Sequence, residues 1–209
     1  MRNKTKLLFY FLKNYKYIIF DLDNTIYDFR DFDYGAFKEI FKFLKIKISE
    51  SKLIKFINFR QKNLLKKKLI DKYLEKLDIP KNSTKKAISI FRNHKCKYIN
   101  KKESLNKLLQ RLKNKNKLLY MISNGERKRQ NKKINKLKIK KYFEKIIICP
   151  PKKNKLKPFK FGFDKIYKKK MILKEIVMVG DSEIDKMFAK KCNIKFIKFK
   201  YINKRYENT

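Results

Sequence analysis

Short apolar runs recur along the chain, separated by longer stretches of mixed polarity. Five of these runs are continuous rather than alternating, and they occupy residues 17–20, 118–122, 146–149, 176–179 and 196–199. Continuous apolar runs of this length are typical of parallel strands that helices bury on both faces. The pattern therefore predicts five strands of one buried sheet.

The stretches between the last four runs carry apolar residues at helical spacing. Ile134 and Leu137 form one such stripe, and Ile184, Met187 and Phe188 form another. Strands that alternate with helices predict an α/β fold, in which right-handed crossovers build a parallel sheet with helices on both faces. We expect the last helix to end near Asn193, because asparagine is the best substitute for glycine in a left-handed C-cap.

The first and second predicted strands are about ninety residues apart, which is too long for an ordinary crossover. This segment has no convincing strand, but it has several amphipathic stripes, which predict an inserted all-helical domain over residues 31–99. The stripes are Phe37, Ile40, Phe41 and Leu44; Leu53, Ile54 and Ile57 after the caps Ser49 and Ser51; Leu65, Leu69, Tyr73 and Leu77; and, beyond a break at Pro80, Ile88 and Phe91 after Ser83. A further helix, with Leu105, Leu108, Leu109 and Leu112 after Ser104, leads back into the sheet.

The composition is that of a folded chain with an extreme positive charge. Hydrophobic residues make up 43% of 209 residues, and 60 Lys and Arg stand against 19 Asp and Glu, for a formal net charge of +41. Nucleic acid, acidic membranes and phosphorylated metabolites are all attracted by such a charge. The basic residues are spread over nearly the whole length, so we interpret them as compositional bias rather than as a concentrated binding patch.

The cysteines, the histidine and the N-terminus exclude several classes. Cys96, Cys149 and Cys192 are odd in number and widely spaced, so we expect neither disulfides nor zinc, and a reducing cytoplasm is the simplest location. His94 is the only histidine, has no obvious partner, and is interpreted as an ordinary surface or capping residue. The apolar stretch 7–12 is too short for a secretory signal, and no run of about 18 apolar residues exists, so we expect a soluble protein without a transmembrane segment.

Candidate chemistry gathers immediately after the apolar runs. In an open parallel sheet, ligands bind beyond the carboxyl ends of the strands. The residues found there are Asp21-Leu22-Asp23-Asn24-Thr25, then Ser123-Asn124-Gly125, then a loop that reaches Lys157-Pro158, and finally Gly180-Asp181-Ser182-Glu183-Ile184-Asp185. Gly125 and Gly180 are two of only four glycines, and each lets the backbone of a turn approach a ligand.

The aspartates at two of these strand ends indicate a metal. Buried carboxylates that lie close together are unfavourable without a cation. Hard oxygen ligands without nearby His or Cys favour Mg²⁺, which takes one or two protein carboxylates. Asp21 and Asp181 are the predicted ligands, with Asp185 in support.

Taken together, the four sets resemble, in order, the four motifs of the haloacid dehalogenase (HAD) superfamily of hydrolases. Asp21, Asp23 and Thr25 match Asp-x-Asp-x-Thr, Ser123 and Lys157 match the second and third motifs, and Asp181 with Asp185 matches the acidic motif. The resemblance covers essentially the whole chain and implies a Rossmann-like HAD core over residues 1–30 and 100–209. It also implies that residues 31–99 are a helical cap of the first cap class.

The resemblance also implies a chemistry for each residue. Asp21 would attack phosphorus to form an aspartyl phosphate, and Asp23 would act as general acid and then base while its main-chain carbonyl contributes to the Mg²⁺ site. Lys157 would neutralise charge on the nucleophile and on the transferred group. The remaining residues would bind phosphoryl oxygens: Thr25, Ser123, and the backbone N–H groups of Asn124 and Gly125.

Departures from the family pattern narrow the prediction to a phosphate monoester hydrolase. Dehalogenases lack the second aspartate, so Asp23 argues against them. Cys192-Asn193 replaces the usual Ala-Gly pair, which we interpret as a structural change.

A small phosphorylated metabolite, such as a sugar phosphate or a nucleotide, is the expected substrate. Two alternatives stay open: a phosphomutase of the same superfamily, and a basic nucleic-acid-binding protein with an idle site, which is not favoured. Tyr34, Arg60 and His94 are only guesses for substrate-contacting residues of the cap.

Overall fold

A computed structural model describes residues 2–63, 74, 80–100 and 103–206 of the chain. The chain divides into two compact units. The sheet unit comprises residues 1–28 and 100–202, and the helical unit comprises residues 29–99 and 203–209. Each unit has its own core of buried side chains.

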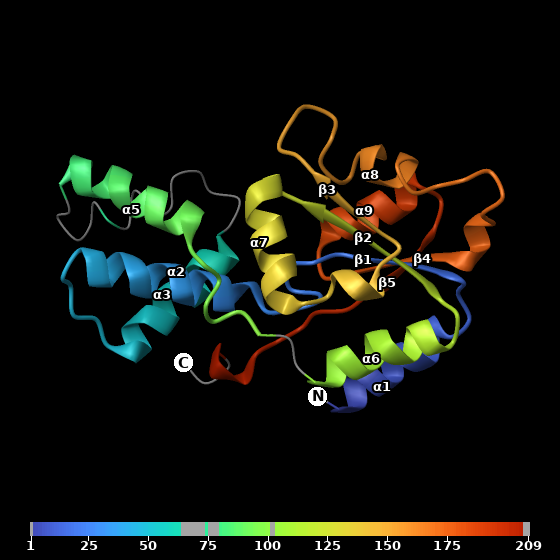
Figure 1. The fold of residues 1–209 in the computed structure, drawn as a ribbon, viewed down its shortest axis with the longest axis horizontal. Coiled ribbons are helices and arrows are strands. Elements are labelled where there is room, and N and C mark those ends of the chain that lie inside the picture. Colours follow the sequence, from blue (N-terminus) through green and yellow to red (C-terminus); the bar gives the residue numbers. More distant parts are fainter. Residues whose placement is uncertain (1, 64–73, 75–79, 101–102, 207–209) are drawn as a thin grey trace. The chain divides into compact units, whose positions relative to one another are not determined.

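The sheet unit is built on five parallel strands (Figure 1). They are β1 (Tyr17–Phe20), β2 (Leu118–Asn124), β3 (Lys145–Cys149), β4 (Ile176–Gly180) and β5 (Lys195–Lys198). Their order in the sheet is β3-β2-β1-β4-β5, and every neighbouring pair is parallel. The predicted α/β fold with a parallel sheet is confirmed.

Burial along the strands follows their place in the sheet. All residues of β1 and β4, which lie at the centre, are buried. At one edge, β5 has exposed ends at Lys195 and Lys198 and an only half-buried middle. At the other edge, Ile146, Ile147 and Ile148 of β3 are also only half-buried. The prediction of full burial is therefore wrong for the third and fifth runs, which form the two edge strands of the sheet and are less covered than its centre.

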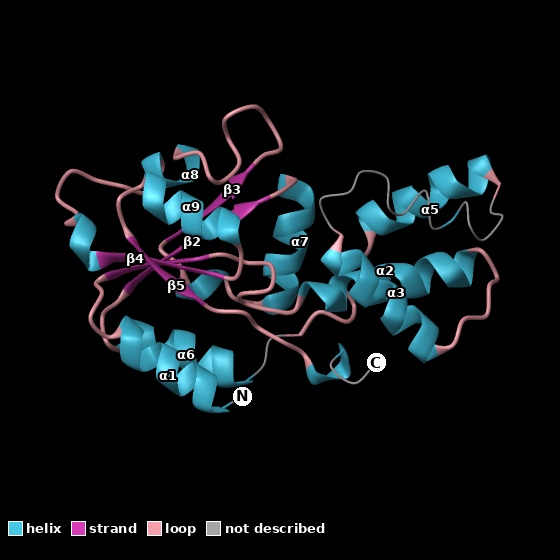
Figure 2. Cartoon of the chain, turned by 180° about the vertical axis from the view of Figure 1, so that it is seen from behind, coloured by secondary structure: helices cyan, strands magenta, loops and turns pink. Residues whose placement is uncertain are grey.

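Helices cover both faces of the sheet, as Figure 2 shows: α8 (Phe161–Asp164) and α9 (Glu183–Lys191) lie on one face, and α1 (Arg2–Leu12) and α6 (Glu103–Asn114) lie on the other. Side chains alternate along a strand. Tyr17 and Ile19 of β1 accordingly pack in one core cluster with Phe163 of α8 and Phe188 of α9. The 3-10 turn η2 (Leu173–Glu175) leads into β4.

Helix α1 was not predicted. Leu8 and Leu12 are buried on its inner side, and it packs against α6, whose four predicted leucines are all buried. Its outer side exposes Leu7, Tyr10 and Phe11. This mixture of buried and exposed apolar residues made the stretch look like one continuous apolar run in the sequence. Among the described residues, no helix has the length and apolar character needed to cross a membrane.

The two predicted helices after β2 and β4 are present, although one stripe was misjudged. Helix α7 (Arg127–Leu137) buries Ile134 and Leu137, and it is followed by the 3-10 turn η1 (Lys140–Tyr142). In α9, Phe188 is buried, but Ile184 and Met187 are 39% and 50% exposed. The prediction that all three face the core is wrong. Just beyond α9, Asn193 takes the expected left-handed conformation (φ 54°).

The helical unit contains α2 (Phe29–Phe43), α3 (Glu50–Lys62) and α5 (Lys81–Asn93). Phe37 of α2 packs edge-on against Phe56 of α3 and also contacts Phe91 of α5, so the predicted aromatic stripes form its core. Ser49 caps α3 as expected, but Ser51, the other predicted cap, lies inside that helix. Ser83 likewise lies inside α5, whose N-cap is Pro80. The predicted stripe Leu65, Leu69, Tyr73 and Leu77 lies outside the described residues.

His94 is a capping residue, one of the two roles that we expected, but it is buried and does not lie on the surface. It occupies the C-cap of α5, is 1% exposed, and its Nδ1 lies 2.9 Å from Oε1 of Glu39. Its ring contacts Phe32 edge-on, and a Cβ at Gly35 would lie 2.5 Å from its Nε2. Glu39 could not be predicted as its neighbour, because the two residues come from α2 and the end of α5.

The C-terminal turn η3 (Lys204–Tyr206) belongs to the helical unit, although it follows β5 in the chain. The buried carboxylate of Asp31 accepts hydrogen bonds from the Tyr206 hydroxyl and from Nδ2 of Asn203, both at 2.9 Å. Arg30 and Asn58 donate to the Tyr206 carbonyl, each at 3.3 Å. Asn203 and Tyr206 are therefore fixed to helices α2 and α3.

Candidate active site

The order of the strands places the predicted residues together. From β1 the sheet continues through β2 to β3 on one side and through β4 to β5 on the other, so the strand order reverses between β1 and β4. Such a switch point is the usual ligand-binding place of an open parallel sheet. Asp21 follows β1 and Asp181 follows β4, one on each side of it.

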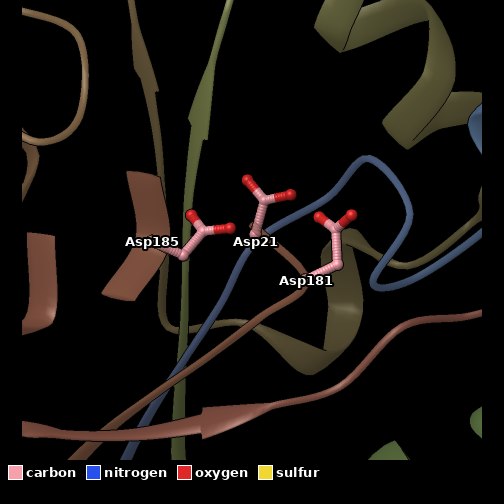
Figure 3. Close-up of side chains that lie close together, drawn as sticks. All are labelled: Asp21, Asp181 and Asp185. Carbon is pink, nitrogen blue, oxygen red and sulfur yellow. The ribbon is translucent and has the colours of Figure 1, made fainter. Parts of the chain in front are cut away.

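Three carboxyl groups meet at this point, as Figure 3 shows. Asp21, Asp181 and Asp185 each offer an oxygen, and these oxygens lie within 4.8 Å of one another; among the described residues they form the one acidic group with metal-binding spacing. Burial, then repulsion from Asp185 and Asp23, raises the pKa of Asp21 to about 8 against the attraction of Lys157. Burial and then Asp185 raise the pKa of Asp181 to about 6. The carboxylates are thus short of positive charge.

Lys157 lies among these carboxylates and is 4% exposed. Its Nζ donates to Oδ1 of Asp21 and to Oδ1 of Asp185, each at 2.5 Å. Burial alone would lower the pKa of this ammonium, but the two carboxylates outweigh burial and hold the pKa above its usual value. Asn124 fixes the backbone of Lys157, accepting from its N–H at 2.7 Å and donating to its carbonyl at 3.2 Å.

Asp185 is held by the first turn of α9. Its Oδ2 accepts from the hydroxyl of Ser182 at 2.6 Å and from the Ser182 N–H at 3.2 Å, while the Ser182 hydroxyl accepts from the Asp185 N–H, which makes a capping box. A Cβ at Gly180 would lie 2.6 Å from the Asp185 side chain. Glycine at the end of β4 therefore leaves the space that Asp185 occupies.

Asn24 shapes the turn after β1. It is in the left-handed region (φ 59°), where asparagine is tolerated better than most residues. Its carbonyl accepts from the N–H of Tyr201 at 2.6 Å, and its side chain hydrogen-bonds Asp181. The residue thus links the strand ends of β1, β4 and β5.

Asp23 is surrounded by groups that sequence analysis missed. Lys133 Nζ and the Tyr27 hydroxyl donate to its Oδ1, the former at 2.8 Å, and Nε2 of Gln130 donates to its Oδ2 at 2.9 Å. Burial acts to raise the pKa of Asp23, but the charge of Lys133 and the hydrogen bonds from Lys133, Tyr27 and Gln130 together outweigh burial, and the pKa lies below its ordinary value. The available signal was the register of α7, which places Gln130 and Lys133 on the same face as Ile134 and Leu137.

The predicted phosphate-binding residues lie beside these carboxylates. Ser123 is 1% exposed, and its hydroxyl accepts from Nε2 of Gln130 at 2.8 Å. Thr25 is fully buried, and its Oγ1 has no hydrogen-bond partner within the described part of the chain. Gly125 has φ 143°, which favours glycine, and its N–H donates to the carbonyl of Cys149 at 2.9 Å, so a phosphoryl oxygen would have to share it.

The three guessed substrate contacts are engaged inside the helical unit. The Tyr34 hydroxyl donates to Glu50 at 2.6 Å, and Arg60 forms an ion pair with the buried Asp33. His94 lies beside Glu39. Each of these side chains therefore has a structural role in the packing of its own unit.

The order of the sheet, the helical insertion after β1 and the carboxylates at the switch point define the HAD-type fold class of α/β hydrolases. The profile of the haloacid dehalogenase-like hydrolase family matches residues 18–199. The chain belongs to this family. None of the curated proteins matches it significantly.

Several solved structures share the fold. A candidate phosphatase from Clostridium difficile is 20% identical with a TM-score of 0.65, over 88% of this chain and 85% of that one. A HAD hydrolase of subfamily IA from Geobacter sulfurreducens is 17% identical with a TM-score of 0.67, over 88% and 87%. A HAD-type hydrolase from Bacillus subtilis, whose structure contains magnesium, is 15% identical with a TM-score of 0.60, over 88% and 86%. At such identities the likeness establishes the fold.

Proposed function

We propose that this chain is a Mg²⁺-dependent phosphate monoester hydrolase that acts through an aspartyl phosphate, with a small phosphorylated metabolite as substrate. The observation that carries the proposal is the convergence of Asp21, Asp181 and Asp185 around Lys157 at the switch point of the sheet. Membership of a hydrolase family agrees with it.

The residues at the switch point fit a magnesium ion. Their donors are hard oxygens, and the raised pKa values of Asp21 and Asp181 indicate carboxylates that lack a compensating cation. Asp21, Asp181 and the main-chain carbonyl of Asp23 would hold the ion. Asp185 supports the site through Lys157 and Ser182, which already bind both of its oxygens. The bound ion would neutralise phosphoryl oxygens and keep Asp21 ionised.

In the first step, a carboxylate oxygen of Asp21 attacks phosphorus, and the bond from phosphorus to the ester oxygen breaks. Asp23 gives a proton to the departing oxygen, so an alcohol leaves and Asp21 carries the phosphoryl group. Lys157, at 2.5 Å from Asp21, stabilises the charge on the attacking group. With its lowered pKa, Asp23 is ionised at neutral pH before substrate binds, so it must take up its proton together with the substrate.

In the second step, Asp23 is already in the form that the chemistry requires. Its carboxylate takes a proton from a water molecule, whose oxygen attacks phosphorus and releases Asp21 and inorganic phosphate. Ser123 accepts a hydrogen bond from Gln130, so its own hydroxyl hydrogen is available to a phosphoryl oxygen. Thr25 and the backbone of Asn124 and Gly125 are proposed to complete the phosphate site.

The helical segment 31–99, together with the C-terminal turn that packs on it, is proposed to act as the cap on the sheet unit. A cap that closes over the carboxylates would exclude bulk water from the aspartyl phosphate until the second step.

The test is turnover of p-nitrophenyl phosphate with and without Mg²⁺, comparing wild type with Asp21→Asn. We expect Mg²⁺-dependent release of nitrophenol by wild type and a loss of at least about 1,000-fold in the variant, because a carboxamide is not a nucleophile. Ile184→Ala, an exposed position on α9, serves as the control. Full activity in a folded Asp21→Asn protein would refute the proposal.

Transfer of the phosphoryl group to a second hydroxyl would use the same residues. A panel of sugar phosphates and nucleotides, assayed for free inorganic phosphate, separates the two outcomes. We expect stoichiometric phosphate release with at least one substrate. Isomerised product without phosphate release would instead identify a mutase.

A further inference from the structure

Helix α7 buries two polar side chains in the sheet unit. Gln130 and Lys133 are each 1% exposed, and because they are three residues apart they lie on the same face of the helix. A buried ammonium is strongly unfavourable unless it is paired. The chain has 60 Lys and Arg residues, and among those that the structure describes only Lys133 and Lys157 are buried. The environment of Lys133 therefore requires an explanation.

Both side chains are directed at one carboxylate, that of Asp23. Lys133 Nζ donates to Oδ1 at 2.8 Å, and Gln130 Nε2 donates to Oδ2 at 2.9 Å. The Tyr27 hydroxyl donates to Oδ1 as well. Donors on both oxygens leave the carboxylate a single orientation.

Gln130 also joins Asp23 to the strand end of β2. Its Nε2 lies 2.8 Å from the Ser123 hydroxyl and 2.9 Å from the Asn124 carbonyl. A Cβ at Gly125 would come within 3.2 Å of the Gln130 side chain, so glycine there gives the amide its room. One side chain thus fixes the distance between the proposed acid-base group and the proposed phosphate-binding serine.

We infer that Lys133 and Gln130 are positioning residues, which hold the Asp23 carboxylate in the orientation needed for proton transfer to the leaving group and from water. The inference rests on the proposed function, in which Asp23 performs both transfers. A purely structural ion pair would instead stabilise the junction of α7 with β1 without affecting proton transfer selectively. The two roles differ in how the reaction depends on the leaving group.

The experiment compares p-nitrophenyl phosphate with glycerol 2-phosphate in Lys133→Met and Lys133→Arg. Nitrophenolate departs without a proton, whereas the glycerol oxygen needs one. For Lys133→Met we expect kcat/KM to fall by about 100-fold or more with glycerol 2-phosphate but less than about 10-fold with p-nitrophenyl phosphate. With the latter, kcat should fall, and a burst of nitrophenol should appear, because water activation still needs Asp23. Lys133→Arg, which keeps the positive charge, should have nearly the wild-type ratio of kcat/KM for the two substrates.

Gln130→Met gives a second, independent variant. It removes the bridge to Ser123. The loss in kcat/KM should again be greater with glycerol 2-phosphate than with p-nitrophenyl phosphate, and the ratio of the two losses should be about a tenth of that in Lys133→Met. Lys136→Met, a matched change at an exposed position of α7, should leave both substrates unaffected. In an Asp23→Asn background, Lys133→Met should cause no more than about a two-fold further loss, because the group it positions is no longer an acid.

Equal losses with both substrates in the folded Lys133→Met and Gln130→Met proteins, or losses that add fully to that of Asp23→Asn, would overturn the inference while leaving the hydrolase assignment intact. A wild-type protein that turns over no phosphate ester would overturn the proposed function, and the inference with it. Selective losses together with the burst would support both.

Discussion

The crowding of Asp21 and Asp181 would couple the proposed metal binding to protonation. Burial raises the pKa of both carboxyls above the ordinary 3.8, to about 8 and about 6. Between these values and 3.8, the metal-free folded protein holds more protons than the unfolded chain does. Stability that depends on these groups is therefore complete below about pH 4 and falls as the pH rises toward 8.

Magnesium should reverse this trend, since it replaces the protons. We expect added Mg²⁺ to raise the unfolding temperature several degrees more at pH 8 than at pH 5, where protons compete for the same oxygens. Thermal unfolding with Mg²⁺ or with chelator across this range measures the difference. Asp181→Asn should abolish most of it, whereas Asp164→Asn, an exposed position, should not. A Mg²⁺ effect that is independent of pH would contradict the coupling.

The positions of single residues show how much of the candidate site could be predicted from the sequence. Asp21, Ser123, Lys157 and Asp181 lie where expected, because the carboxyl ends of parallel strands share one edge of the sheet. Lys133 could not be singled out, because its contact with Asp23 spans 110 positions and lysine is common throughout this chain. Its burial depends on the packing of α7, which the sequence indicates only as an apolar stripe.

At the scale of elements, the junction of β4 with α9 is a tight turn that also holds Asp185 in the candidate site. Gly180→Ala would place a methyl group 2.6 Å from the Asp185 side chain. We expect a loss of stability of about 1–3 kcal/mol and a weaker Mg²⁺ site, because Asp185 must move away from Lys157. Denaturant unfolding and calorimetric Mg²⁺ titration measure the two effects.

Gly162→Ala is the matched control for this change. Its methyl group would lie equally close, at 2.6 Å, to Ile122, which is apolar. A comparable loss of stability with unchanged Mg²⁺ affinity is expected. If both variants weaken Mg²⁺ binding alike, the junction has no special part in supporting the site.

Strands were predicted correctly where a continuous apolar run alone indicates the element. Continuous apolar runs indicated every strand of the sheet, but burial at the edge depends on neighbours that a single run does not reveal, as β5 shows. Helix α1 was not predicted, because its apolar residues lie on both its inner and its outer side and so form no stripe. In α9, Ile184 and Met187 are exposed to solvent. Apolar residues at helical spacing therefore do not all belong to the core of this helix.

At the scale of the whole molecule, the C-terminal turn stabilises the helical unit. Tyr206→Phe removes the hydroxyl that donates to the buried Asp31, and we expect a loss of about 1–3 kcal/mol in unfolding free energy. Hydrogen exchange should accelerate in α2 and α3. Tyr10→Phe, an exposed tyrosine of α1, should change neither quantity. Equal behaviour of the two variants would exclude a structural role for the turn.

The same turn also sets an order of events during synthesis. Helices α2, α3 and α5 leave the ribosome long before residues 203–206, although all of them belong to the same unit. Asp31 remains without its Tyr206 and Asn203 partners throughout that interval. The helical unit therefore reaches its final packing only after residues 203–206 have left the ribosome.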